Sequence, residues 1–202
     1  MATTFRRSPL SLAVLGLLYG EPMHPYAIQQ RIKQWGKDKV VNVGQRASLY
    51  KTINRLREAD LVTVRETERD QQYPERTVYE ITDAGRAAVM VWMGEMLGSP
   101  RNEFPEFPAA LSFLALLGPQ STLELLTRRR ELLAAVAADL ATDVANSLGF
   151  GLPRVLMLED EYLRHMAEAE LGWLDAVIAD LRDGRLTWTK DSLDAFAAAV
   201  GQ

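Results

Sequence analysis

The chain has 202 residues and no cysteine, which excludes disulfides and thiolate zinc sites, and its length suits one ordinary domain or two small ones. Its hydrophobic fraction of 48% and charged fraction of 25% are typical of a soluble, cytoplasmic protein, and its continuous apolar runs are much shorter than a membrane span. The net charge of −4 conceals a basic first part, with 14 Lys and Arg against 10 Asp and Glu in residues 1–90, and an acidic remainder, with 9 against 17. This asymmetry is compatible with a DNA-binding head on a tail that has another task.

The first 35 residues predict a short arm and two helices. Arg6 and Arg7 in the arm either lie on a phosphate backbone or are merely solvated. Ser8-Pro9 favours a helix start, because serine caps a helix and proline fits its first turn. The core stripe expected in the helix over residues 10–19 is Leu10, Val14, Leu17 and Leu18. The residues expected on the buried side of the next helix, which starts at Pro25, are Tyr26, Ile28, Ile32 and Trp35, and the hydroxyl of Tyr26 can still reach the surface.

The third predicted helix, residues 45–59, is the most informative stretch of the chain. Leu49, Ile53 and Leu56 are spaced four and three residues apart, which places them on one side of a helix. The residues on its other faces are Arg46, Ala47, Tyr50, Lys51 and Asn54. Lysine and arginine neutralise phosphate, and asparagine or arginine can read a base edge through two hydrogen bonds. Taken alone, the pattern fits a solvated surface helix equally well.

A β-hairpin and a fourth helix follow. Asp60 is expected in the left-handed conformation that ends a helix. Residues 61–66 and 76–82 alternate apolar with polar and predict two strands, and the charged loop 67–75 between them predicts a wing. The apolar side of the helix expected over residues 83–97 carries Val89, Trp92, Met93 and Met96. This order predicts a mainly α fold with a small hairpin, a winged helix-turn-helix.

Several segments of residues 8–97 resemble the PadR family of bacterial transcription regulators. They are Leu15-Gly16-Leu17-Leu18, His24-Pro25-Tyr26-Ala27-Ile28, Leu49-Tyr50 with Arg55-Leu56, Leu61-Val62, and Ile81-Thr82-Asp83-Ala84-Gly85. Pro25, Arg57 and Asp60 depart from the usual pattern, in which glycine, an acid and glycine are common at these positions. None of the three departures removes a DNA-facing group. The resemblance implies a homodimer that is held together by C-terminal helices.

The second half of the chain predicts a separate helical domain. Residues 98–108 contain three prolines and are expected to link a head, residues 1–97, to a dimerisation domain, residues 109–202. After a short apolar helix over residues 109–117, two long amphipathic helices are expected before a short last helix or a frayed tail. The ranges of the long helices are about 119–146 and 153–183.

Two long amphipathic helices joined by a short turn cannot bury all of their apolar residues alone. The simplest cover is a second copy of the hairpin, which gives a twofold bundle. The alternative is a hairpin that folds back on the head of its own chain. The residues expected at the homodimer interface are Leu133, Val136, Leu140, Leu163, Leu174 and Ile178.

The sequence contains no catalytic constellation. His24 and His165 lie far apart in the chain, and His24 suits a helix cap better than a metal site. Glu161 and His165 are four residues apart and are expected to pair on a helix surface, but two ligands leave a metal site incomplete. We therefore expect no enzyme activity, no metal and no cofactor.

Trp92, Met93 and Met96 allow two interpretations. Aromatic and thioether groups on one helix form either plain core or an adaptable surface for a flat apolar ligand. The resemblance favours the ligand somewhat, because some PadR-like regulators bind aromatic or drug-like effectors where two subunits meet.

The sequence thus favours a homodimeric repressor whose recognition helices, residues 45–59, enter the major groove of double-stranded DNA at an inverted-repeat operator. A small aromatic effector would release DNA by favouring a dimer with wrongly spaced heads. The residues expected to contact DNA are Arg46, Ser48, Tyr50, Lys51, Asn54, Arg55 and, on the wing, Arg69. The alternative is a helical interaction module whose winged head binds protein instead of DNA.

Overall fold

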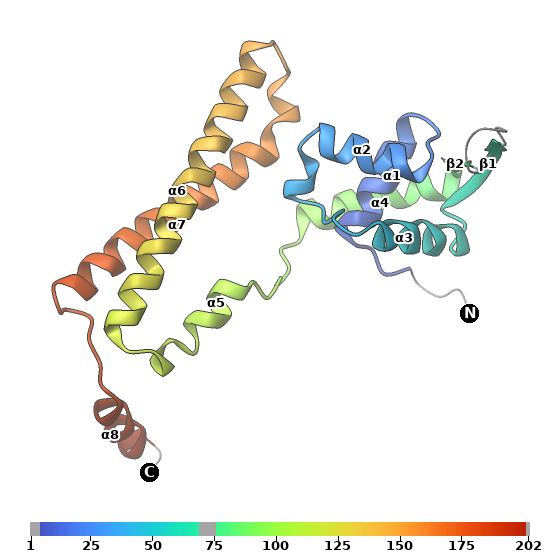
Figure 1. Cartoon of the computed structure of the whole chain (residues 1–202). Helices are drawn as coiled ribbons and strands as arrows, with labels where there is room; N and C mark the ends of the chain where they lie inside the picture. Colours follow the sequence, from blue (N-terminus) through green and yellow to red (C-terminus); the bar gives the residue numbers. More distant parts are fainter. Residues whose placement is uncertain (1–4, 69–75, 201–202) are drawn as a thin grey trace. The chain divides into compact units, whose positions relative to one another are not determined.

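The computed structural model divides the chain into two compact units, Met1–Asn102 and Glu103–Gln202, and describes residues 5–68 and 76–200 (Figure 1). The elements of unit 1 are α1 (Pro9–Gly20), α2 (Pro25–Gln34), η1 (Lys37–Lys39), α3 (Arg46–Glu58), β1 (Val62–Glu68), β2 (Arg76–Ile81) and α4 (Asp83–Gly98). The two strands pair antiparallel, with Val62 opposite Ile81, and β1 carries a bulge between Val64 and Glu66. The predicted winged helix-turn-helix is confirmed.

The core of unit 1 lies between α1, α2, α3 and the hairpin. Of the expected α1 stripe, Leu10, Val14 and Leu18 are buried, but Leu15 takes the place of Leu17, which is half-buried. Tyr26 and Trp35 were expected on the buried side of α2 and are exposed, so this prediction was wrong. The physical reason is that both rings pack under cations at the surface. The guanidinium of Arg46 lies 5.8 Å from the Tyr26 ring, and that of Arg31 lies 5.2 Å from the Trp35 ring.

Side chains cap the helices where the sequence predicts their starts. The Ser8 hydroxyl accepts a hydrogen bond from the Ser11 backbone N–H at 3.1 Å, and Ser11 Oγ accepts one from the Ser8 N–H at 2.7 Å. Nδ1 of His24 accepts the Ala27 backbone N–H at 2.9 Å, which confirms the expected cap. Asp60 ends α3 with a φ of 57°, the predicted left-handed conformation.

The segment Thr82–Gly85 joins α4 to the end of α3 and the start of β1. The Thr82 hydroxyl donates to the Asp60 carbonyl at 2.6 Å and accepts the Gly85 N–H at 3.0 Å. A Cβ on Gly85 would lie 2.1 Å from the carbonyl oxygen of Leu61. Thr82 and Gly85 belong to a segment that resembles the PadR family, and their role here is structural. They dock the first turn of α4 on the backbone of Asp60 and Leu61.

Unit 2 is an antiparallel helical hairpin with shorter helices at its ends (Figure 1). Its elements are α5 (Glu106–Leu111), η2 (Leu114–Leu116), α6 (Pro119–Gly149), η3 (Arg154–Leu156), α7 (Leu158–Arg182) and α8 (Lys190–Val200). The hairpin interior contains Leu126, Leu174, Ile178 and Leu181. Helix α5 begins at Glu106, inside the expected linker, and the stretch expected to be one helix over residues 109–117 is broken between α5 and η2.

Helix α6 has a combination of length and mean hydropathy that its short apolar runs did not predict. It is long and apolar enough to cross a membrane when only length and composition are considered, although its continuous apolar runs are short. It also carries charged residues along its length, among them Arg130 and Asp139, and packs along α7. Buried core helices of soluble proteins pass the same test, whereas the apolar window of α6 is largely exposed within one chain.

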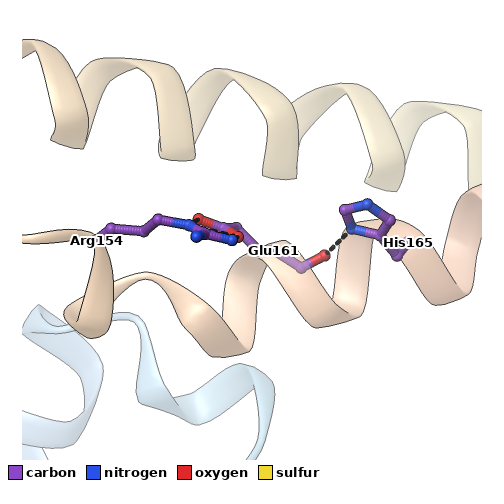
Figure 2. Close-up of polar contacts among 3 residues, drawn as sticks. All are labelled: Arg154, Glu161 and His165. Carbon is purple, nitrogen blue, oxygen red and sulfur yellow. Dashed lines mark hydrogen bonds and ion pairs between the residues drawn. The ribbon is translucent and has the colours of Figure 1, made fainter.

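The turn before α7 is held by an arginine. Figure 2 shows the guanidinium of Arg154 alongside the carboxylate of Glu161, to which its Nε and Nη2 donate at 3.0 and 2.9 Å. The ring of His165 instead bonds to the backbone carbonyl of Glu161, with Nδ1 2.7 Å from the oxygen. The expected pairing of the Glu161 and His165 side chains is therefore replaced, because Arg154 offers the carboxylate two donors. Arg154 holds the pKa of Glu161 below its usual value.

This ion pair predicts a pH dependence of the stability of unit 2. Because the folded-state pKa of Glu161 is lowered, its contribution is fully present above the unfolded pKa and is lost as the pH falls through the folded pKa. Glu161→Gln should therefore lower the thermal midpoint near pH 7, and this deficit should become smaller when the measurement is repeated at about pH 3, because the wild-type carboxylate then begins to take up its proton. Glu168→Gln, which alters a carboxylate 3.8 Å from Arg164, is the control. A Glu161→Gln deficit that is equal at both pH values would contradict the assignment.

Candidate nucleic-acid interface

Helix α3 has a buried back and an exposed front. Leu49, Ile53 and Leu56 are buried in the core of unit 1, as their spacing predicts. The exposed residues of α3 include Arg46, Ala47, Ser48, Tyr50, Lys51, Asn54, Arg55 and Arg57. The front therefore offers cations, an amide and a phenol to a partner. These groups suit phosphate oxygens and base edges.

The start of α3 is fixed by the loop that precedes it. Val41 and Val43 from this loop are buried in the core. The side-chain amide of Gln29, which is buried on α2, donates to the Val43 carbonyl at 2.9 Å. An open depression beside this loop is lined in part by Lys33 and Asn42. The loop thus sets the angle at which α3 leaves α2 and adds polar surface next to its first turn.

Tyr26 extends the exposed front from α3 onto α2. Its ring lies under the guanidinium of Arg46 and stacks against His24, with the ring centroids 6.2 Å apart. The hydrophobic periodicity of α2 placed Tyr26 in the core and so missed this position. Its place in the first turn, directly after His24-Pro25, was the available signal, since residues at a helix start often lie at the rim of a packed face.

The basic residues of the arm and wing have different surroundings. Arg6 is exposed, whereas Arg7 pairs with Glu95 of α4 and its side chain is only 13% exposed. Of the two arginines of the arm, Arg6 is therefore the more accessible to a partner. The guanidinium of Arg55 lies over the Phe5 ring, 5.0 Å from its centroid. Arg69, the residue predicted to contact DNA from the wing, lies outside the described residues.

The three residues considered for an effector do not share one surface. Trp92 is 8% exposed and stacks on Phe5, with centroids 5.4 Å apart and planes inclined by 16°. Met93 and Met96 are 39% and 36% exposed, on the outer side of α4. Within one chain, the indole is therefore covered while the two thioethers face outward.

The six residues predicted at a dimer interface also differ in how exposed they are within one chain. Leu140, Leu174 and Ile178 are buried inside the hairpin of their own chain, and Val136 is 49% exposed. Leu133 and Leu163 are half-buried. The apolar residues that remain exposed along the hairpin include Leu125, Leu132 and Val136 on α6 and Leu158, Tyr162, Met166 and Trp173 on α7. They recur at helical spacing, so each long helix has a second apolar stripe beside the one that forms the hairpin.

Comparisons with known proteins agree with this architecture. Residues 14–90 match the model of the "Transcriptional regulator PadR-like family". PadR from Bacillus subtilis in complex with operator DNA is 19% identical, with a TM-score of 0.69, over 88% of this chain and 99% of that chain. No curated protein matches the sequence.

Two further solved structures share the fold. The structure of Bacillus subtilis PadR with p-coumaric acid is 20% identical, with a TM-score of 0.67, and the match covers 86% of this chain and 98% of that chain. The Vibrio cholerae virulence activator AphA is 21% identical, with a TM-score of 0.60 and the same coverage of the two chains.

Proposed function

We propose that the chain is a transcriptional regulator of the PadR-like kind, the family whose model matches residues 14–90. We further propose that it binds an inverted-repeat operator as a homodimer and represses transcription in the cytoplasm. The matched family consists of transcriptional regulators, which supports the expectation that the chain is not an enzyme. The observation that carries the proposal is the exposed front of α3, where Arg46, Tyr50, Lys51 and Asn54 stand opposite a buried leucine and isoleucine stripe. An inverted repeat presents one half-site to each of two symmetric recognition helices.

The homodimer is supported by the amount of surface that one chain exposes. The accessible surface of the chain is 14237 Å². Two separate globular units that share its mass of 22.6 kDa would expose about 11,500 Å². The excess of about 2,800 Å² is large enough to supply one subunit's share of an obligate interface. The exposed stripes of α6 and α7 contribute apolar area to this excess, and a second hairpin is their simplest cover.

A small aromatic effector is part of the proposal. It is supported by the PadR structure that contains p-coumaric acid and by the thioethers of Met93 and Met96, which provide a soft apolar surface on α4. In the dimer, such a surface would be completed by residues of the partner subunit. The effector would favour a dimer whose two recognition helices no longer match the half-site spacing.

A gel-shift assay tests this function directly. The probe is the duplex immediately upstream of the protein's own gene, with and without p-coumaric acid and related small aromatic acids. We expect a shifted band at low salt, which competitor duplex of unrelated sequence removes only in large excess, and a weaker shift in the presence of an effector. A chain that does not shift any duplex at low salt would instead favour the protein-binding alternative.

Lys51 provides a sharper test of the α3 surface. Lys51→Ala should weaken binding to operator and unrelated duplexes alike, because a lysine–phosphate contact carries no sequence information. The slope of log K against log salt should fall in magnitude by about 0.9 for each subunit. Lys190→Ala, which removes an exposed lysine from α8, is the matched control and should leave the slope unchanged. An unaltered slope in Lys51→Ala would exclude Lys51 from the phosphate contacts.

A further inference from the structure

The aromatic ring of Phe5 contacts one residue of α3 and one residue of α4. One side of the ring faces the indole of Trp92 on α4, nearly parallel and 5.4 Å away between centroids. The guanidinium carbon of Arg55, in the last turn of α3, lies 5.0 Å from the same ring. Indole, phenyl ring and guanidinium thus form a chain of contacts from α4 to the recognition helix.

The arm that carries Phe5 is anchored directly after the contact. Two residues later, the guanidinium of Arg7 pairs with Glu95, one turn after Trp92 on α4. Ser8 then forms the reciprocal cap of α1 with Ser11. An ion pair and a helix cap therefore fix the backbone directly after Phe5, which makes its ring position a property of the fold.

The type of partner decides what this contact does to Arg55. A carboxylate would take up the N–H donors of the guanidinium and neutralise its charge. An aromatic ring attracts the guanidinium through its face and leaves the N–H groups at the edge of the plane available for a phosphate fork. Phe5 can thus restrict a long side chain, which otherwise loses rotamer freedom on binding, without competing for its donors.

We propose that Phe5 is a positioning residue for DNA binding, which holds the guanidinium of Arg55 ready for a phosphate and ties it to Trp92 of α4. The proposal rests on the proposed function, because it requires that α3 contacts DNA. The competing interpretation is that Phe5 only covers Trp92. In that case, its loss would lower the stability of unit 1 and leave the contribution of Arg55 to DNA affinity unchanged.

A double-mutant cycle on the full chain separates these interpretations. Affinity for the operator duplex is measured by fluorescence anisotropy at low salt for wild type, Phe5→Ala, Arg55→Ala and the double variant. We expect Phe5→Ala to weaken binding about five- to thirtyfold in the dimer, because one Arg55 side chain in each subunit would then have to be ordered on binding. The double variant should bind no more weakly than Arg55→Ala alone. Effects of the two substitutions that simply multiply would overturn the proposal.

Two further variants at position 5 separate the effect of an aromatic ring face on affinity from the effect of apolar volume alone. Phe5→Leu keeps an apolar cover on Trp92 but has no ring face, so it should retain the urea-unfolding midpoint and still lose affinity. Phe5→Trp retains a ring face and should restore affinity. Wild-type affinity in Phe5→Leu would overturn the proposal. If wild-type protein binds no duplex, the proposed function and this inference both fail, whereas DNA binding with a multiplicative cycle refutes the inference alone.

Discussion

Replacing Gly85 by alanine is expected to destabilise unit 1 by about 3 kcal/mol, at the upper end of what overpacking usually costs. The new Cβ would lie 2.1 Å from the Leu61 carbonyl oxygen and 2.7 Å from a side-chain carbon of Ile81. The first of these atoms belongs to the backbone, so no rotamer change can relieve the contact. Alanine would gain only about 1 kcal/mol over glycine in helix propensity, which is too little to offset the overlap. The first turn of α4 must then move away from the end of α3, together with the Thr82 cap.

Gly94 on the same helix provides the control. No atom lies within 4 Å of a Cβ built at Gly94, so Gly94→Ala should leave the protein as stable as wild type or slightly more stable. Amide hydrogen exchange of α3 and β2 in the full chain measures the stability of unit 1 separately from that of unit 2. Equal protection in Gly85→Ala and Gly94→Ala would show that α4 docks elsewhere.

Val136→Glu is expected to dissociate the proposed dimer and to lower operator affinity by about a hundredfold or more. Val136 is 49% exposed in one chain and lies in the apolar stripe of α6 with Leu132. A twofold interface would receive the new carboxylate twice, and each copy would lose water without gaining a cation. Affinity falls with dissociation because two linked recognition helices bind a two-site duplex with a high effective concentration, which a single subunit lacks.

The matched control is Ala138→Glu, which introduces the same charge two residues away. Ala138 is exposed and points away from the Val136 stripe, since two residues turn a helix by about 200°. Sedimentation velocity should show a single subunit for Val136→Glu and a dimer for Ala138→Glu. A Val136→Glu protein that remains a dimer would place the interface on another surface.

The order of elements in unit 1 could be predicted because local signals agree with the packing. Ser8, His24 and Thr82 start helices with side-chain caps, and the spacing of Leu49, Ile53 and Leu56 selects the buried side of α3. These signals span three or four residues and need no knowledge of the rest of the chain. For the same reason, the left-handed Asp60 was predictable from its position after α3.

Contacts between distant segments were not predictable from periodicity. Phe5 and Trp92 are far apart in sequence, and only the fold brings their rings together. Tyr26 was assigned to the core because a tyrosine counts as apolar in a helical pattern, whereas Arg46 provides it with a surface partner from another helix. The sequence of an apolar stripe also does not indicate whether another helix of the same chain or a second subunit covers it.

The long helices of unit 2 illustrate this limit. Leu140, Leu174 and Ile178 were expected to face a second subunit, and they pack within their own hairpin. Tyr162, Met166 and Trp173 lie on a second stripe of α7 and are not among the residues predicted at the dimer interface. Because each helix has two apolar stripes, the first is used within the chain and the second is available to a partner.

The anchored position of Phe5 has a practical consequence for work on the purified protein. Any peptide fused to the amino end is joined a few residues before a ring that contacts Arg55 on the recognition helix. The histidines of an affinity tag would add charge or metal-binding groups to that end of the chain, and this addition would enter every measurement of operator affinity. A tag fused after α8 is joined to unit 2 and leaves the residues next to Phe5 unchanged, so a carboxyl-terminal fusion, or cleavage of an amino-terminal one, is the appropriate preparation.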